Sequence, residues 1–291
     1  MNCFELKKGS MRLLLADPLA ADPYYRGTRF DRSGVILNLE YAEHSYVRPW
    51  YRRYDPFMHD AVSGPSEEFT QIGYDAAAPG DTFLKIGVGL LRRDDAPYNR
   101  FNLYEVVDSG RVSVEKKDDS ALFRQELEGV YDYYKKVEIL DDGRLIICHK
   151  LLNLGKELLD FYVYSHNFFI LDGSSVGRAT HFGFPFHPEG DWRAEYDCVR
   201  LTENGIAFNR DLLEGESVFM GNLHSPDGPV QDFVFTLANS DNGLRVEGKC
   251  DRKVAYSVFW SNHDVACIEP YVPLCVKPGS AVSWNLEYRF L

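Results

Sequence analysis

The stretch from Val282 to Phe290, VSWNLEYRF, carries an apolar side chain at every second position. Successive side chains of a β-strand point to opposite faces, so these apolar residues would share one face. The polar residues between them, from Ser283 to Arg289, would lie on the other face. This period of two predicts a strand that buries one side and leaves the other for water or a ligand.

The same alternation recurs along the chain. In the segment VILNLEY, the residues Val35, Leu37, Leu39 and Tyr41 are predicted to share one face. Similar segments occur at residues 111–118, 131–140, 144–154, 157–171, 230–238, 244–249 and 253–261. This pattern predicts an all-β fold of large antiparallel sheets, two of which pack face to face.

Turn-forming pairs of the Asn-Gly and Asp-Gly type separate several of these segments, as expected for a chain of hairpins. They include Asn204-Gly205, Asp227-Gly228 and Asn242-Gly243. The best candidate for a helix is the piece at residues 209–220, although Gly215 weakens its pattern. No linker rich in Pro, Gly or Ser divides the chain, so we expect a single domain that spans residues 1–291.

The composition restricts the partners. The chain has 44 acidic and 32 basic residues, a formal net charge of −12 at pH 7. This charge repels phosphate backbones and anionic lipids, and no basic stripe reverses it locally, so we expect no nucleic acid and no membrane partner. It also disfavours a strongly anionic substrate, unless a few arginines in a cleft overcome it locally.

The N-terminal region and the cysteines restrict the compartment. The apolar run that begins at Met11 is interrupted by Asp17 and Pro18, which leaves it too short for a signal peptide or a membrane span. The six cysteines are scattered without a Cys-x-x-Cys pair, so neither a zinc cluster nor a disulfide framework is indicated. We expect a cytoplasmic protein that is a monomer or a homodimer.

Several motifs of catalysis are absent from the sequence. It contains no Gly-rich phosphate loop, no Gly-x-Ser-x-Gly elbow and no His-Glu-x-x-His, so no cofactor is expected. Four histidines lack partners at ligand spacing, and we therefore expect no metal site. They are His44, His59, His224 and His263.

Two titratable residues stand in apolar surroundings. His166 lies in YSHNFFILD, and Glu269 lies between apolar residues in VACIEPY. A histidine on an apolar strand is most often a satisfied core residue. Burying an unpaired carboxylate is costly, however, so Glu269 needs a partner or a function.

These two segments resemble motifs of the aldose 1-epimerases, also called galactose mutarotases. HNFFIL, which begins at His166, looks like the family's Asn-His-x-Tyr-Phe-Asn-Leu motif. CIEPYVPLCVKPGS, which contains Glu269, looks like its Cys-Leu-Glu-Pro segment with the following Pro-Gly turn and closing strand. The order and spacing of the two motifs along the chain also match.

The resemblance implies a galactose mutarotase-like supersandwich with a sugar cleft on the concave face of one sheet. It implies His166 as the acid and Glu269 as the base of a reaction that interconverts the anomers of an aldose. Opening the sugar ring requires removal of the proton of the anomeric hydroxyl and delivery of a proton to the ring oxygen, which one base and one acid can perform. The expected partner is a small-molecule sugar.

The sequence also departs from the family pattern. The family's other histidine is expected in the first half of the chain, where this sequence reads FLKIGVGLLRR and Lys85 stands in its place. Lys85, Arg29 and Glu68 are predicted to help bind the substrate. Trp192, in the loop 181–192, is a candidate aromatic platform for a sugar ring, with an ordinary packed loop as the equal alternative.

Two other functions remain open at the level of the sequence. One is a carbohydrate-binding protein that keeps the cleft without catalysis, because the first-half histidine is missing. The other is a glycoside hydrolase or lyase that uses two carboxylates, with Glu68 facing Glu269 across the sugar.

Overall fold

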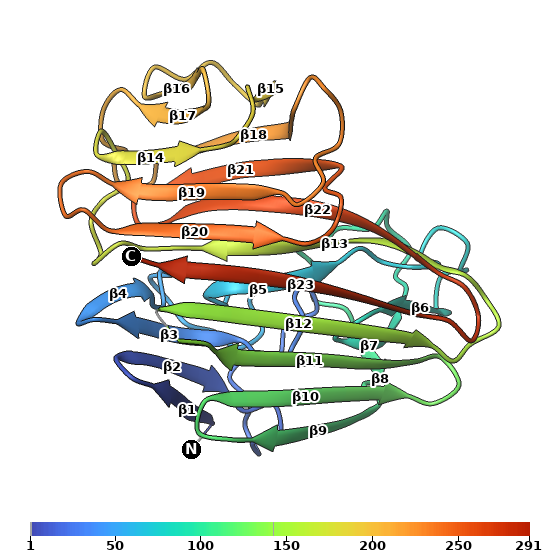
Figure 1. Cartoon of the computed structure of the whole chain (residues 1–291). Coiled ribbons are helices and arrows are strands. Elements are labelled where there is room, and N and C mark those ends of the chain that lie inside the picture. Colours follow the sequence, from blue (N-terminus) through green and yellow to red (C-terminus); the bar gives the residue numbers. More distant parts are fainter. Residues whose placement is uncertain (1, 142) are drawn as a thin grey trace.

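The computed structural model of the protein describes residues 2–141 and 143–291. These residues form four antiparallel sheets and no helix (Figure 1). No described segment is therefore a helix that could cross a membrane. The absence of helix corrects one expectation: the piece at 209–220 is a turn, with Gly215 at φ +80°, followed by a strand that begins at Ser217.

Two large sheets make up most of the molecule. The ten-stranded sheet has the order β16 (Val199–Thr202), β17 (Gly205–Phe208), β14 (Thr180–Gly183), β19 (Val234–Asn239), β20 (Arg245–Cys250), β23 (Ala281–Phe290), β12 (Arg144–Asn153), β11 (Tyr131–Ile139), β10 (Ser120–Leu127) and β9 (Arg111–Lys116). The six-stranded sheet has the order β15 (Glu189–Trp192), β18 (Ser217–His224), β21 (Tyr256–Asn262), β22 (Ala266–Val276), β13 (Leu159–Phe168) and β5 (Gly64–Phe69).

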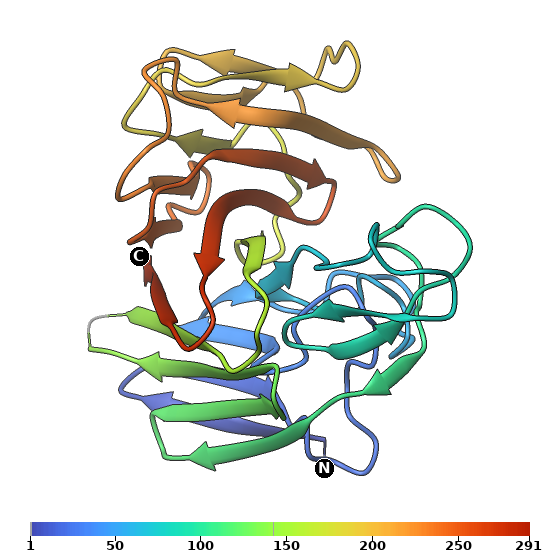
Figure 2. The same cartoon turned by 90° about the vertical axis from the view of Figure 1, so that its right-hand side faces the viewer.

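Two smaller sheets flank the large ones. One contains β1 (Cys3–Lys8), β2 (Met11–Ala16), β3 (Ile36–Tyr41) and β4 (His44–Val47), and the other contains β6 (Thr82–Lys85), β7 (Gly89–Arg92) and β8 (Val106–Asp108). The four-stranded sheet packs against β10, where the rings of Phe4 and Phe123 are 6.3 Å apart. The three-stranded sheet and the curved ten-stranded sheet lie on opposite sides of the molecule (Figure 2).

The predicted alternation of β23 is confirmed. Trp284, Leu286 and Tyr288 are buried, whereas the residues between them are at least partly exposed. The buried face meets the six-stranded sheet: the ring of Trp284 lies edge-on to that of Phe69 in β5, 6.1 Å away. The two large antiparallel sheets thus pack face to face around a shared core, as the sequence predicted.

The predicted single face of β3 is wrong at one point. Leu37 and Val35 belong to one apolar cluster, whereas Leu39 belongs to the main core. The register of β3 against β2 shifts at this point: Leu14 pairs with Asn38, whereas Leu15 pairs with Ile36, which leaves Leu37 as the extra residue. A β-bulge inserts one extra residue and reverses the alternation beyond it.

Tyr288 provides the first test of this packing. Its buried hydroxyl donates a 2.7 Å hydrogen bond to Oδ1 of Asn167 in β13 and so joins the two large sheets. Tyr288→Phe is expected to lower the free energy of unfolding by about 1–3 kcal/mol, because a buried hydrogen bond is lost. Urea denaturation at pH 7 would measure the difference.

Tyr162→Phe is the matched control for Tyr288→Phe. The Tyr162 side chain is 38% exposed. Loss of the Tyr162 hydroxyl should change the free energy of unfolding by less than about 0.5 kcal/mol. Equal effects of the two substitutions would contradict the role given to the Tyr288 hydrogen bond.

Candidate active site

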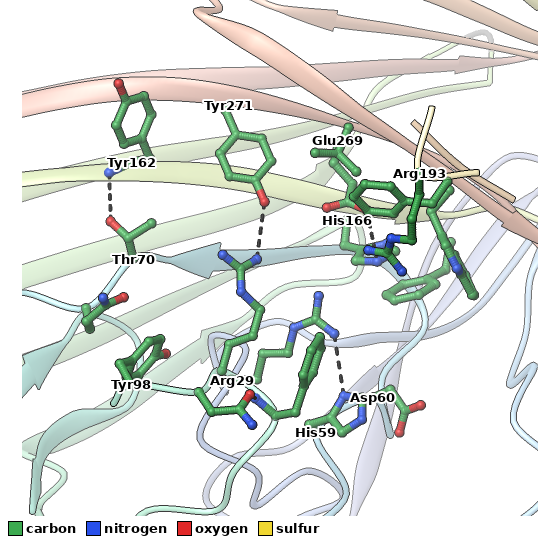
Figure 3. Close-up of a pocket in the computed structure, with 18 of the residues that line it drawn as sticks. Arg29, His59, Asp60, Thr70, Tyr98, Tyr162, His166, Arg193, Glu269 and Tyr271 are labelled. Carbon is green, nitrogen blue, oxygen red and sulfur yellow. Dashed lines mark hydrogen bonds and ion pairs between the residues drawn. The ribbon is translucent and has the colours of Figure 1, made fainter. Parts of the chain in front are cut away.

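A cavity of about 850 Å³ opens on the face of the six-stranded sheet that points away from the ten-stranded sheet (Figure 3). Side chains of β13, β18, β21 and β22 form its floor. The segments 48–63, between β4 and β5, and 93–105, between β7 and β8, supply most of its walls. The cavity therefore combines a rigid strand floor with walls from irregular segments, as many ligand sites do.

Strand alternation brings the two predicted catalytic residues into this cavity. In β13, Ser165 and Asn167 face the core and bond to the Tyr288 hydroxyl, which directs His166 to the opposite face. In β22, the neighbouring strand, Glu269 points to the same face. The distance between His166 Nε2 and Glu269 Oε1 is 3.2 Å, although 103 residues of sequence separate them (269 − 166).

Aromatic rings fix the orientation of His166. Its imidazole stacks on Phe168, with the ring centres 3.7 Å apart and the planes at 7°. Trp260 lies edge-on at 5.8 Å. The imidazole has no hydrogen-bond partner at Nδ1 within the described residues, so only its Nε2 edge is matched to a polar group of the protein.

Burial controls the protonation of the pair. His166 is 5% exposed and Glu269 is 4% exposed. Burial, aided by the positive charge of Arg29, places the pKa of His166 well below its usual range, and burial raises the pKa of Glu269 to about 8. Near pH 7 the pair therefore holds one proton on Glu269 while His166 is neutral, the reverse of the starting roles implied by the family resemblance.

Glu68 lies beneath the cavity and organises its positive charges. Its carboxylate accepts a 2.7 Å hydrogen bond from Arg29 Nε, a 3.1 Å bond from Lys85 Nζ and a bond from the Tyr164 hydroxyl. Burial alone would raise its pKa, but Lys85 and Arg29 lower the pKa of Glu68 to about 2. Glu68 is 1% exposed and does not line the cavity. The expectation that it helps bind the substrate by direct contact is therefore corrected: Glu68 holds the residues of the wall from beneath.

Lys85 is also placed behind the wall and not inside the cavity. It is fully buried, and burial lowers its pKa to about 8 against the opposing charge of Glu68. Its ammonium donates a 2.8 Å hydrogen bond to the hydroxyl of Tyr98, which does line the cavity. The expectation that Lys85 contacts a sugar directly therefore needs correction, since it reaches the cavity only through Tyr98.

Arg29, which was predicted to help bind the substrate, lines the cavity, and a second histidine lies beside it. Its Nη1 lies 3.5 Å from Nδ1 of His59. A guanidinium can only donate, so Nδ1 of His59 accepts and the neutral ring carries its proton on Nε2. Burial, with a further contribution from Arg29, lowers the pKa of His59, which favours this neutral form.

No family model matches the sequence, and no curated protein matches it. A galactose mutarotase-like protein from Clostridium acetobutylicum matches the structure with a TM-score of 0.58 and 14% identity, covering 99% of this chain and 95% of that one. A galactose mutarotase-like protein from Lactobacillus casei matches with a TM-score of 0.56 and 13% identity, covering 99% and 100%.

A candidate aldose 1-epimerase from Escherichia coli K12 gives a similar result, with a TM-score of 0.55 and 13% identity over 99% of this chain and 98% of that one. The chain has the galactose mutarotase-like fold. The supersandwich predicted from the sequence is therefore confirmed. At these identities the likeness is one of fold.

Within this mutarotase-like fold, several lining residues escaped the sequence analysis. Tyr271 and Trp260 had a usable signal, because Tyr271 follows Glu269 by two positions in β22 and Trp260 lies in the strand predicted at 253–261. Trp50 and Arg100 had none, since they lie in irregular segments. Trp192 is not in the lining: its ring packs edge-on to Phe259, 6.1 Å away, so the packed-loop alternative applies.

One group of possible metal ligands was found outside the cavity. Among residues 2–141 and 143–291, only Asp197, Cys198 and Glu216 bring three ligand atoms together. Nη2 of Arg210 lies 2.7 Å from Asp197 Oδ1 and 2.7 Å from Glu216 Oε1. The guanidinium already neutralises both carboxylates, so this group has no need of a cation.

Proposed function

We propose that the protein is an aldose 1-epimerase that interconverts the anomers of a sugar in this cavity. The observation that carries the proposal is the contact between His166 and Glu269, 3.2 Å apart at the floor of an open cavity. The volume of about 850 Å³ lies within the range of about 300–1,000 Å³ typical of small-molecule sites.

The short distance suits the chemistry of a hemiacetal. The anomeric hydroxyl and the ring oxygen are bonded to the same carbon, so two groups in contact with each other can reach both oxygens of one ring. In the proposed reaction, Glu269 gives its proton to the ring oxygen while neutral His166 accepts the proton of the anomeric hydroxyl. The C1–O5 bond breaks, C1 becomes a carbonyl carbon, and rotation about the C1–C2 bond presents its other face.

Ring closure reverses these transfers. The released hydroxyl at C5 attacks the carbonyl and returns its proton to Glu269, while His166 returns its proton to the oxygen at C1. Each residue ends the cycle in its starting form, so the pair is ready for the next sugar. A positioned acid or base contributes about 10²–10⁴-fold, which is useful for a reaction that already proceeds in water.

Other lining residues supply the features expected of a sugar site. The aromatic rings of Trp50, Phe101 and Trp260 offer flat apolar walls for the C–H faces of a pyranose. His59 can donate from Nε2, and Asp60 has a buried Oδ1 with no partner within the described residues. Both residues line the cavity.

The two-carboxylate alternative has weaker support. It requires Glu68 to face Glu269 across the sugar, one carboxyl group as acid and the other as base or nucleophile. Glu68 is 1% exposed, lies outside the lining and is held by Arg29 and Lys85, so it does not face a sugar bound in this cavity.

Anomer exchange tests the proposal. Saturation-transfer NMR on a panel of aldoses should reveal exchange between α and β anomers that exceeds the rate in buffer and grows in proportion to protein concentration. Sugar binding without such exchange would contradict the proposal and favour the carbohydrate-binding alternative. Release of reducing ends from oligosaccharides would contradict it in favour of a hydrolase.

A further inference from the structure

The cavity is positively charged, in contrast to the chain as a whole. The chain carries a net charge of −12, yet the lining contains three arginines and only two carboxyl groups, Asp60 and Glu269. Glu269 is largely protonated near pH 7, since its pKa is raised to about 8 by burial. The lining therefore has a local excess of positive charge, which allows an acidic chain to bind an anionic ligand.

Two of the three arginines are already bound by the protein. Arg29 donates to Glu68 and to the Tyr164 hydroxyl at 2.7 and 3.1 Å. Arg100 donates from Nη1 to the hydroxyls of Tyr164 and Tyr271 at 3.0 and 3.2 Å, and the same atom lies 3.7 Å from Glu68. Glu68 also pairs with Lys85, so one carboxylate serves three cations and leaves their charge only partly balanced.

Arg193 differs from the other two, because it forms no ion pair with any residue in the described part of the chain. It follows β15 and points into the cavity from the side opposite Arg29 (Figure 3). Its guanidinium lies over the ring of Phe219, with Cζ 3.8 Å from the ring centre, and its backbone N–H donates to the Phe219 carbonyl at 3.1 Å.

This stacking leaves the edge of the guanidinium available. An arginine held by its face keeps the N–H groups of its rim free, and these match the two oxygens of a carboxylate or phosphate in a bidentate arrangement. The free rim of Arg193 is therefore suited to an oxyanion on the ligand.

We propose that the sugar bound in this cavity carries an oxyanion, a carboxylate or a phosphate, which Arg193 binds with support from the charge of Arg100. This inference rests on the proposed function for the reaction, but the binding of the oxyanion can be measured separately. It names the class of substrate: an acidic or phosphorylated aldose and not a neutral one.

The experiment compares glucose, glucuronate and glucose 6-phosphate, which differ only at C6. We expect kcat/KM for anomer exchange to be higher for at least one of the two anions than for glucose, and the preferred anion identifies the source of the oxyanion. Arg193→Gln is expected to lower the ratio of kcat/KM for the preferred anion to kcat/KM for glucose by about 10- to 100-fold. This is the usual effect of losing a hydrogen bond to a charged group. Arg193→Lys should lie between.

Arg111→Gln is the matched control, since Arg111 is an exposed arginine of β9 outside the cavity and should leave the ratio unchanged. The inference would be overturned if kcat/KM of the wild type were no higher for either anion than for glucose. It would also be overturned if Arg193→Gln left the ratio of kcat/KM for the anion to kcat/KM for glucose unchanged. If no sugar shows exchange, the proposed reaction fails. Dissociation constants of the same three sugars, measured by NMR titration, then decide the oxyanion site by the same comparison.

Discussion

Glu269→Gln is expected to reduce catalysed anomer exchange by about 10²–10⁴-fold. Glutamine has the shape of the carboxyl group but can neither give a proton to the ring oxygen nor take it back. The loss should appear in kcat, because the proton is transferred only in the reacting complex. Saturation-transfer NMR with a saturating sugar would measure it.

The pH dependence of kcat/KM provides a second readout for this pair. The active form needs one proton, so the rate should fall above pH 8, where Glu269 loses it, and again on the acid side when His166 gains one at a pH well below 6.5. In Glu269→Gln the residual rate should lose the alkaline decline. An unchanged profile in the variant would contradict the assignment.

Stability separates a catalytic role of Glu269 from a structural one. The pKa of Glu269 is raised to about 8 in the folded protein from an ordinary value of 4.5, so folding loses stability as pH rises between these values. Glu269→Gln removes this penalty, and at pH 8 the variant should melt at a higher temperature than the wild type. Glu287→Gln, at a partly exposed ion pair with Arg144, is the control and should change neither rate nor melting temperature.

Glu68→Gln is expected to lower the free energy of unfolding by about 3–5 kcal/mol at pH 7, the usual cost of removing one partner of a buried ion pair. The substitution leaves Arg29 and Lys85 without their carboxylate, and Lys85 is fully buried. Chemical denaturation followed by tryptophan fluorescence would measure the change. Anomer exchange should also fall, since Arg29 loses the bond that holds it in the cavity wall.

The effect of Glu68 should depend on pH in a defined direction. Its pKa is lowered to about 2 in the folded protein, so its contribution is fully present above pH 4.5 and disappears as pH falls towards 2. The stability difference between the wild type and Glu68→Gln should shrink over that interval. Glu126→Gln, whose partners Arg111 and Arg124 are exposed, should cost at most about 1 kcal/mol. Equal losses for the two variants would refute the role of Glu68.

The strand pattern explains why the fold could be predicted from the sequence. Alternation in β23 depends only on neighbouring residues, and its buried face follows directly from the order of side chains. His166 and Glu269 could be found because each is a polar residue within an otherwise apolar strand. Their contact could not be derived from spacing, since it requires β13 and β22, which lie more than 90 residues apart along the chain, to pair as neighbouring strands.

The walls of the cavity could not be predicted for a physical reason. Arg100 bonds to Tyr164 and Tyr271, which are 64 and 171 residues away, from a segment with no periodic pattern. Lys85 was expected to contact the substrate because it stands where the family has a histidine in the sequence. In the fold it lies at the end of β6, where its ammonium bonds to the buried Glu68 and not to the cavity. Local patterns predict faces of strands but not the path of the irregular segments above them.

Glu67 and Glu68 are adjacent in β5, and their side chains point to opposite faces of it. Glu67 binds Lys135 and His149 from the ten-stranded sheet, whereas Glu68 binds Arg29 and Lys85 under the cavity. One short strand therefore forms buried ion pairs both with the ten-stranded sheet and with the residues under the cavity. For engineering, this separates what can be varied from what must be kept. The cavity walls in segments 48–63 and 93–105 can be mutated to alter ligand preference, whereas a library that includes β5 would lower the folding yield.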